Sequence, residues 1–326
     1  MRYRNMGKWG VQLSTIGLGS YLTIGFKLDD KTSKATIRTA YDGGVNFFDT
    51  ADAYNKGEAE KVLGKHLAEF PRESLFLLTK CWLNITGYIN GGGLSAKHIK
   101  EACHASLKRL KTDYIDLYMC HRPDPDTPLE ETIRALEDLA RQGKILYWGV
   151  SEWPAHLIAR ANRVAKELGA RPIGVSEPRY SLLYRYPERN LFPCTQAEGI
   201  GNVVFSALAH GMLTGKYKPG EEAPEGTRAA DDDTSSVIKR LYWTEENKSK
   251  AQEFASIAGD LGVTPAQLAI AWCLRNPAVT SVISAATKVS QVEDNIAASE
   301  IDIPDDAADK IDELFPPSET VESEGH

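Results

Sequence analysis

The sequence predicts an α/β protein whose eight parallel strands close into a (β/α)8 TIM barrel. Eight short apolar runs alternate with longer segments of helical periodicity along the 326 residues. The runs are apolar throughout rather than at every second position, as expected of parallel strands that are covered on both faces. The competing architecture is a doubly wound sheet, but Gly17-Leu18-Gly19 is followed by Ser-Tyr-Leu. Because the G-x-G-x-x-G turn of a dinucleotide-binding sheet is absent, the barrel is the preferred prediction.

Each expected strand is a short, mainly apolar run. The runs cover residues 15–18, 45–48, 75–79, 114–119, 145–150, 173–176, 203–205 and 281–283. Amphipathic stretches predict helices at residues 34–42, 58–69, 96–110, 129–142, 155–168 and 246–261, a second helix at 265–275 and a final C-terminal helix at 305–314. Ser95 is the expected N-cap of the third helix, and Pro128 and Gly143 mark the two ends of the fourth.

Three segments lie outside this alternation. Residues 1–13 are expected to form an N-terminal β-hairpin that closes the bottom of the barrel, with Gly7 and Gly10 at its turn. Residues 84–93 are glycine-rich and are interpreted as a lid on the substrate side. Residues 216–237 form a long acidic loop, and loops of this length are usually functional or disordered. Because no separate linker is present, residues 1–326 are interpreted as one domain.

Composition argues against several classes of partner. The 38 Lys and Arg residues are outnumbered by 45 Asp and Glu residues, and the net charge of -7 argues against a nucleic-acid-binding surface. The N-terminus lacks the apolar core of a secretory signal, and no apolar run is long enough to span a bilayer. The five scattered cysteines contain no C-x-x-C pair and are interpreted as free thiols. We therefore expect a cytoplasmic protein without membrane insertion.

Four residues of complementary chemistry follow neighbouring strands. Asp49, Lys80 and His121 come at the ends of the second, third and fourth expected strands, and Tyr54 lies five residues beyond Asp49. Barrel enzymes carry their active sites at the C-terminal ends of the strands, so these side chains are expected to meet there. We expect Lys80 to lower the pKa of Tyr54, so that the phenol can protonate a carbonyl oxygen. Asp49 would hold Lys80, and His121 would orient the carbonyl.

Each of these residues also has a purely structural interpretation. A lone histidine at a strand end is more often a satisfied structural residue, a lysine a solvated cation, an aspartate a turn residue and a tyrosine ordinary packing. Four such residues rarely meet at one rim by chance, so their joint placement favours function. A barrel lyase or metal-dependent hydrolase would need carboxylates and histidines around a metal. Only one histidine is in place, so no metal site is predicted.

Longer motifs resemble the aldo-keto reductase superfamily. They are GVNFFDTADAY, LLTK, ASLKRLKTDYIDLYMCHRPDPDTPLEET, ILYWGVSEW, SALAHGMLTGKY and QLAIAWCLRNPAVTSV, and they cover nearly the whole chain. HRPDPDTPLEET, YWGVSEW and QLAIAWCLRN resemble in particular the branch that includes the voltage-gated potassium-channel beta subunits. Those subunits often lack the histidine found here as His121, and its presence favours a working reductase over a purely regulatory module.

The resemblance implies a barrel that binds NADP(H) in an extended conformation without a Rossmann motif. Near the nicotinamide it places Ser20, Tyr21, Lys27, Asp49, Ser151, Glu152 and Glu177, with Tyr180 stacked beneath the ring. At the pyrophosphate it places Ser206, Ala207, Leu208, Ala209, His210, Gly211 and Lys216, with Arg228 in a segment that covers the cofactor. At the adenosine end it places Ala285, Thr287, Lys288, Gln291, Asp294 and Asn295.

The adenosine end also has a physical rationale. Thr287 and Lys288 open a helical stretch after the eighth strand, where free N–H groups and the helix dipole attract an anion. A hydroxyl and an ammonium suit a 2′-phosphate, so NADP(H) is preferred over NAD(H). A surface lysine near a helix start is common, however, so this preference rests on the resemblance. Asp294 and Asn295, about two turns along, are within reach of the adenine amino group.

Two acidic residues depart from the family pattern. Glu177 stands where glutamine is usual, and Glu152 stands where Asn or Arg is usual. If both are ionised and close, they stabilise the cationic ring of NADP+ and make bound NADPH a stronger hydride donor. The alternative is that they turn outward or are neutralised by Arg179 or Arg185.

The sequence thus predicts an NADPH-dependent reductase of aldehydes, with ketones as a second class, in which Tyr54 delivers the proton. Tyr21, Trp82, Tyr88 and Trp153 are the expected pocket walls and favour aromatic or medium-sized apolar substrates. The alternative is an NADP(H)-binding regulatory partner of a membrane channel that turns over slowly. The expected partner is a small carbonyl compound. A homo-oligomer would match the tetramers of the related branch, and a channel-type partner is not expected.

Overall fold

The computed structural model describes residues 1–317 and contains a closed barrel of eight parallel strands, as predicted. The strands are β3 (Ile16–Gly19), β4 (Phe47–Asp49), β5 (Phe76–Cys81), β6 (Ile115–Cys120), β7 (Ile145–Ser151), β8 (Val175–Glu177), β9 (Gly201–Val204) and β10 (Val279–Ser284). They follow one another around the barrel in chain order, and β10 pairs with β3 to close it. All except β9 end one or two residues later than predicted, so that polar residues such as Asp49, Ser151 and Glu177 end their strands.

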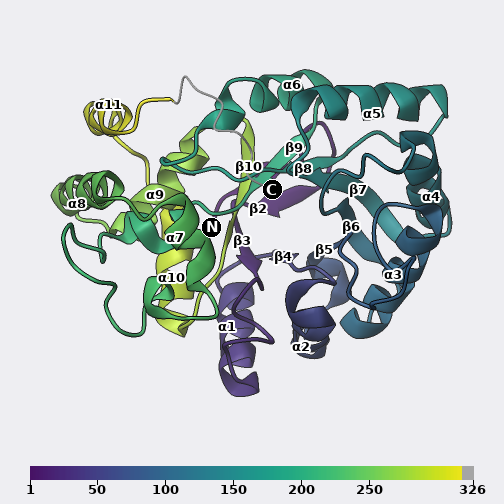
Figure 1. Ribbon diagram of the computed structural model, residues 1–326, viewed down its shortest axis with the longest axis horizontal. Helices are drawn as coiled ribbons and strands as arrows, with labels where there is room; N and C mark the ends of the chain where they lie inside the picture. Colours follow the sequence, from purple (N-terminus) through teal and green to yellow (C-terminus); the bar gives the residue numbers. More distant parts are fainter. Residues whose placement is uncertain (318–326) are drawn as a thin grey trace.

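Helices surround these strands (Figure 1). The eight predicted helices correspond to α1 (Asp30–Asp42), α2 (Glu58–Leu67), α3 (Ala96–Leu110), α4 (Leu129–Arg141), α5 (Ala155–Glu167), α8 (Glu245–Asp260), α9 (Pro265–Arg275) and α11 (Asp305–Leu314). The expected cap of α3 is confirmed, because the Ser95 side chain accepts a hydrogen bond from the His98 amide. The stretch expected after the eighth strand is α10 (Val289–Ala297).

Two helices were not predicted. The first, α6 (Leu191–Glu198), carries Pro193 in its first turn, and the second, α7 (Ser235–Leu241), is seven residues long. Neither has a side-chain hydrogen bond at its N-cap. Both are too short to show a clear helical period, although Asn190 and Thr234 at their N-caps are residue types that often start helices.

The N-terminal hairpin closes the bottom of the barrel, as predicted. Its strands β1 (Tyr3–Asn5) and β2 (Gln12–Ser14) pair antiparallel. Met6 and Leu13 are fully buried and belong to the cluster of inward-facing barrel side chains. Gly7 has a φ of +58°, and a Cβ atom there would lie 2.4 Å from the backbone oxygen of Gly199. The turn that presses this hairpin against the barrel therefore requires a glycine.

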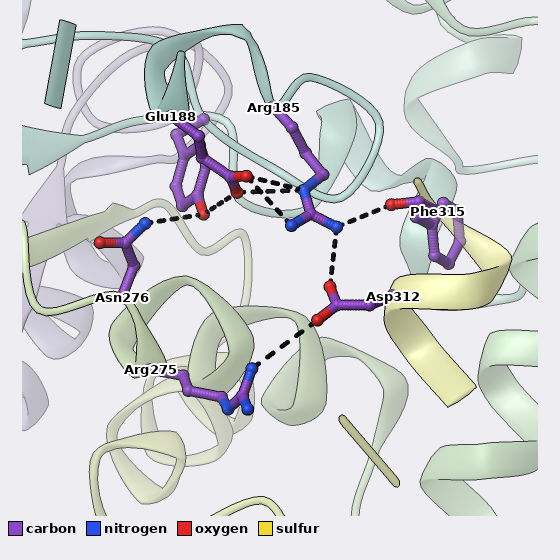
Figure 2. Close-up of polar contacts among 7 residues, drawn as sticks. Arg185, Glu188, Arg275, Asn276, Asp312 and Phe315 are labelled. Atoms are coloured by element: carbon purple, nitrogen blue, oxygen red, sulfur yellow. Dashed lines mark hydrogen bonds and ion pairs between the residues drawn. The ribbon is translucent and has the colours of Figure 1, made fainter. Parts of the chain in front are cut away.

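A polar cluster fastens the last helix to the segment between β8 and β9 (Figure 2). The Arg185 guanidinium donates to both carboxylate oxygens of Glu188, to Asp312 Oδ1 at 2.7 Å and to the carbonyl oxygen of Phe315 at 2.8 Å. Arg275 lies 3.8 Å from the other Asp312 oxygen. Because Arg185 is committed to these partners, it does not neutralise Glu152 or Glu177, which was one alternative left open by the sequence.

All five cysteines are free, and four of them are buried. Within residues 1–317 no single helix is long and apolar enough to cross a membrane. Helices α8 and α9 together have the length and composition of a membrane span, but the chain bends by 89° at the break between them.

Candidate active site

The four residues predicted to act together meet at the C-terminal ends of β4, β5 and β6. Asp49 ends β4, Lys80 lies in β5, His121 follows β6 directly, and Tyr54 begins the 3-10 turn after β4. Lys80 Nζ donates to Asp49 Oδ1, to the carbonyl oxygen of Thr50 at 3.1 Å and to the Tyr54 hydroxyl at 3.3 Å. The Tyr54 and His121 rings meet edge to face, with centroids 5.8 Å apart. The structure therefore gathers the predicted set into one cluster.

Burial and charge set the protonation states in this cluster. Burial raises the pKa of Tyr54, and although Lys80 lowers this pKa, Asp49 and Glu177 raise it further. Lys80 therefore lowers the pKa of Tyr54 as expected, but burial and the two acids raise this pKa by more. Burial lowers the pKa of Lys80, but Asp49 and Glu177 more than offset this effect and the pKa is raised overall. At neutral pH the cluster thus holds a protonated phenol beside a charged ammonium.

The imidazole of His121 is neutral at the same pH. Burial lowers the pKa of His121 well below its usual range, and the positive charges of Lys80 and Arg122 lower it further. A neutral imidazole can donate one hydrogen bond to a carbonyl oxygen without competing with Tyr54 as an acid.

Glu177 is a second acid beside Lys80. It ends β8, is buried, and places Oε2 3.3 Å from Lys80 Nζ. Among the described residues this oxygen has no partner in hydrogen-bond geometry, so the contact is an ion pair with unused acceptor capacity. Burial raises the pKa of Glu177 to about 8, Lys80 opposes that effect and Asp49 adds to it. Of the two alternatives for this residue, the inward orientation is the one that the structure shows.

Glu152 lies at the same rim, directly after β7. Its backbone adopts a left-handed φ of +57°, a strained conformation for a residue with a side chain. Its Oε1 accepts a hydrogen bond from the Arg179 amide at 2.7 Å. The neighbouring Ser151 hydroxyl donates to the carbonyl oxygen of Glu177 at 3.1 Å. These contacts join the ends of β7 and β8 and hold the Glu177 backbone in place.

Of the residues after β3, Ser20 and Tyr21 lie near the cluster around Tyr54, whereas Lys27 binds the acidic loop. Ser20 is buried, and the Tyr21 ring lies against Tyr54 with centroids 5.0 Å apart. Lys27 was expected near the nicotinamide, but its ammonium is engaged with Asp231 at 3.0 Å and Asp233 at 2.7 Å. Lys27 therefore ties the acidic loop to the β3 side of the barrel.

The four residues expected as pocket walls lie in different surroundings. Tyr21 and Trp82 are partly exposed near the strand ends, as a wall requires. Trp153 is buried among the core residues that contact the strands, so its assignment to the wall is wrong. Tyr88 is 77% exposed and encloses nothing.

Tyr88 belongs to a loop that is held together by one of its own side chains. Asn84 Oδ1 accepts from the Gly87 amide at 2.8 Å, and Asn84 Nδ2 donates to the carbonyl oxygen of Tyr88 at 2.6 Å. At the far end the Gly93 amide donates to the carbonyl oxygen of Trp82 at 2.8 Å. The tip residue Ile89 is 97% exposed. The loop predicted as a lid thus stands beside the mouth with its apolar tip in solvent.

The assignment of Tyr180 as the stacking aromatic is wrong. Tyr180 is 1% exposed, its ring packs on Trp272 and Phe192, and its hydroxyl donates to Glu188 at 2.6 Å. No face of the ring is left for a ligand. Phe205, expected as the last residue of a strand, follows β9 directly and is half-buried. Its place immediately before the predicted pyrophosphate loop is the feature of the sequence that would have marked it as a candidate stacking aromatic.

The predicted pyrophosphate loop has an unusual backbone. Its residues are Ser206, Ala207, Leu208, Ala209, His210 and Gly211. Four of them, Ser206, Ala209, His210 and Gly211, have positive φ angles between 46° and 100°. The loop is a tight, internally bonded turn, because the Ala209 amide donates to the carbonyl oxygen of Ser206 at 2.7 Å and the Gly211 amide to that of Leu208 at 2.8 Å. The buried side chains of Ala207 and Ala209 leave the backbone as the contacting part.

Two cations without acidic partners lie beside this loop. Arg228 donates to His210 Nδ1 at 3.1 Å. Burial lowers the pKa of Lys216, and Arg228 lowers it further. Burial also lowers the pKa of Arg228 and brings that of His210 down to about 3. Neither Lys216 nor Arg228 forms an ion pair with any residue of the described chain. Lys216 is exposed and Arg228 is half-buried, and two such cations without an acidic partner among the described residues favour the binding of an anion.

The residues predicted for the adenosine end lie in and before α10. They are Ala285, Thr287, Lys288, Gln291, Asp294 and Asn295. Lys288 is the exposed N-cap residue, and its side chain makes no capping hydrogen bond. Gln291 Oε1 accepts from both the amide and the hydroxyl of Thr287, at 2.8 and 3.1 Å. Asp294 accepts from the Thr264 hydroxyl at 3.0 Å, so this carboxylate already has a partner.

Comparison with known proteins agrees with this fold. The model of the Aldo/keto reductase family matches residues 15–315. The chain therefore belongs to the aldo/keto reductase family, a family of oxidoreductases whose members generally bind NADP(H).

Within the family the chain is similar to proteins named as channel subunits. It is 41% identical over 304 residues to the probable voltage-gated potassium channel subunit beta of Arabidopsis thaliana, with 92% of each chain covered. It is 39% identical over 323 residues to the putative voltage-gated potassium channel subunit beta of Schizosaccharomyces pombe, with 96% of this chain and 93% of the relative covered. The resemblance to the channel beta-subunit-like branch is thus confirmed.

Proposed function

We propose that the protein is an NADPH-dependent reductase that converts aldehydes, and ketones as a second substrate class, into alcohols. One observation carries this proposal: buried Lys80 joins Asp49 to the Tyr54 hydroxyl, beside a neutral His121. Tyr54 is thereby held as a proton donor in a fixed position, and His121 can donate a hydrogen bond to the same carbonyl oxygen. The bound cofactor supplies the hydride that complements this proton.

The residues around the barrel mouth fit NADP(H). The left-handed loop has Lys216 and Arg228 beside it, and these two cations, which form no ion pair with the described residues, can bind a pyrophosphate. Lys288, at the N-terminus of α10, offers an ammonium to the 2′-phosphate. Ser20 Oγ and Glu177 Oε2 are buried and have no hydrogen-bond partner within residues 1–317, so both can bind polar atoms of the nicotinamide end.

Aromatic residues support an apolar or aromatic substrate. Tyr21 and Trp82 border the cluster around Tyr54, and the half-buried Phe205 is a candidate platform for the nicotinamide ring. The proposal describes a cytoplasmic enzyme of small carbonyl compounds that acts as a monomer or a homo-oligomer.

The test is NADPH oxidation with a panel of aromatic and aliphatic aldehydes and ketones, with NADH as the control cofactor. Tyr54→Phe should keep NADPH affinity and lower kcat about 10²- to 10⁴-fold, because general acid catalysis contributes that much. Tyr41→Phe removes a hydroxyl that contacts only Ser74, and this matched control should turn over normally. Full activity of Tyr54→Phe would exclude the proposed role.

The names of the similar proteins favour a second candidate function, that of a cofactor-binding partner of a membrane channel. Such a protein would bind NADPH, co-purify with a membrane protein and reduce aldehydes slowly. Turnover numbers within the usual enzyme range of about 1–10³ s⁻¹ would favour the reductase. Stable co-purification with a channel, together with much slower turnover, would favour the second function.

A further inference from the structure

Two carboxyl groups share the ammonium of Lys80, which is one acid more than this ammonium can neutralise. Asp49 accepts a hydrogen bond from Lys80 Nζ, and Glu177 Oε2 lies 3.3 Å from the same nitrogen. All three side chains are buried. If both acids were ionised, the cluster would carry a net negative charge where water cannot solvate it. Like charges that share such a site titrate apart, and one acid keeps its proton.

Glu177 is the acid that keeps the proton. Burial raises the pKa of Asp49 as well, but the hydrogen bond from Lys80 favours its ionised form. At 3.3 Å, Glu177 Oε2 lies farther from Lys80 Nζ than Asp49 Oδ1 does, and no donor in the described part of the chain meets this oxygen in hydrogen-bond geometry. Because burial raises the pKa of Glu177 to about 8, its side chain is mainly protonated at pH 7.

The other titratable groups around Glu177 supply little positive charge. Tyr54, from the turn after β4, is protonated, and His121, from the end of β6, is neutral. Arg122 lowers the pKa of Glu177 less than Lys80 does, and its guanidinium donates to the carbonyl oxygen of His121 at 2.6 Å. At the end of β7 the same guanidinium lies 3.5 Å from the Ser151 hydroxyl, and the following residue is another acid, Glu152, which accepts from the Arg179 amide.

We propose that Glu177 is a proton store for Tyr54 and is connected to it through Lys80. Lys80 Nζ lies 3.3 Å from both the Tyr54 hydroxyl and Glu177 Oε2, so it can pass a proton from one to the other. Glu177 thus acts through Lys80 and does not itself contact the substrate. This inference rests on the proposed reductase function.

Each proton and electron has a source and a destination in this scheme. Tyr54 gives its proton to the carbonyl oxygen, Lys80 gives one to the Tyr54 phenolate, and Glu177 gives one to Lys80. The carbonyl carbon receives hydride, with its electron pair, from NADPH. The net change in the protein is one ionised carboxylate, and it appears as the nicotinamide ring becomes cationic, so the two new charges offset each other. Solvent returns the proton to Glu177 after NADP+ leaves.

In this scheme the ionisation of Glu177 makes the binding of NADP+, but not that of NADPH, depend on pH. NADP+ brings a cationic ring and should expel the Glu177 proton, whereas NADPH brings a neutral ring and should not. Release of a proton on binding makes affinity rise with pH. The ratio of the NADP+ and NADPH dissociation constants should therefore fall about tenfold per pH unit from pH 6 to about 8, and level off above it. Titration of the 2′-phosphate affects both cofactors and cancels in the ratio.

The experiment measures both dissociation constants by fluorescence titration between pH 6 and 9 in wild type, Glu177→Gln and Glu101→Gln. Glu177→Gln keeps the shape and an acceptor oxygen but has no ionisable proton, so its ratio should not change with pH. Glu101, an exposed acid of α3 that pairs with Lys97, lies outside the site, so Glu101→Gln is the matched control and should keep the slope. Calorimetry in two buffers of different ionisation enthalpy should detect proton release when NADP+ binds to wild type at pH 7, and none in Glu177→Gln.

A flat ratio in wild type would overturn the proton store, as would a slope that survives in Glu177→Gln or disappears in Glu101→Gln. Melting temperatures of the variants show whether Glu177→Gln folds normally. If it does not, the proton count of wild type alone decides the question. Absence of binding by either cofactor would refute the reductase proposal as well, whereas tight binding with a flat ratio would refute only the proton store.

Discussion

Arg185 offers the sharpest test of how the C-terminal helix is held. Its guanidinium binds both oxygens of Glu188, Asp312 and the carbonyl oxygen of Phe315, as Figure 2 shows. Its side chain is 10% exposed, against 22% for Glu188 and 38% for Asp312. Arg185→Met removes the guanidinium and keeps much of the apolar stem, so that the loss reports the polar contacts.

The expected cost follows from these exposures. Hydrogen bonds between charged groups contribute about 1.5–3 kcal/mol when buried, and the contact with Glu188 is in this class. The contact with Asp312 is more exposed and adds about 0.5–1 kcal/mol. The free energy of unfolding should therefore fall by about 3 kcal/mol. For a chain of 326 residues the unfolding entropy is about 0.7 kcal/mol per kelvin, so Tm should fall by about 4 °C.

The assay is thermal unfolding at one scan rate, with Arg275→Met as the matched control. Arg275 is 44% exposed and lies 3.8 Å from Asp312, so its loss should cost less than about 0.5 kcal/mol. Equal melting temperatures for Arg185→Met and Arg275→Met would refute the reasoning, because they would show that the buried guanidinium contributes no more than an exposed one.

Three further predictions concern other parts of the chain. Gly7→Ala should lower the free energy of unfolding by about 2–4 kcal/mol, because the new Cβ would lie 2.4 Å from a backbone oxygen. Urea unfolding measures it, and Gly10→Ala, with no atom within 4 Å, should change little. Lys80→Met should lower kcat at saturating NADPH about 10²-fold or more, because Tyr54 loses its only protein hydrogen-bond donor in the described chain; an unchanged kcat would contradict the cluster's role. Lys216→Met should weaken NADPH binding about tenfold to a hundredfold and reduce its salt dependence, as measured by titration at two ionic strengths. Unchanged affinity would mean that the pyrophosphate binds elsewhere.

The barrel could be predicted because its strands are continuous apolar runs and its helices carry clear periodicity. Most strands end later than predicted, because residues such as Asp49 and Glu177 are polar and a hydrophobic pattern stops before them. The backbones of these residues continue the strand pairing, and their polar side chains lie at the strand ends. Polar residues at a functional site therefore make the end of a strand hard to recognise in the sequence. The short helices α6 and α7 offered too little pattern for prediction.

The catalytic cluster could be predicted because Asp49, Lys80 and His121 lie at or next to the ends of neighbouring strands, and Tyr54 lies in the turn that follows one of them. Its protonation could not be predicted in the same way. Proximity of Lys80 to Tyr54 was foreseeable, but the pKa of Tyr54 depends on how fully the phenol is buried, which only the packed structure reveals. Tyr180 was assigned wrongly for a related reason. An aromatic residue near a strand end can face the mouth or the helices, and the pairing of Tyr180 with Trp272 is a tertiary contact between distant segments.

The loop closed by Asn84 can change in sequence, and so change the entrance to the site, without affecting the stability of the barrel. Its turn is fastened by hydrogen bonds within residues 84–93 and to Trp82, while Tyr88 and Ile89 at the tip stand in solvent. Replacing the tip therefore removes no core contact and incurs almost no folding penalty. Libraries randomised at these two positions, with Asn84 kept, should yield variants that remain folded and differ in the compounds they accept. Diversification of the catalyst, in the laboratory or in evolution, would begin most readily at this edge.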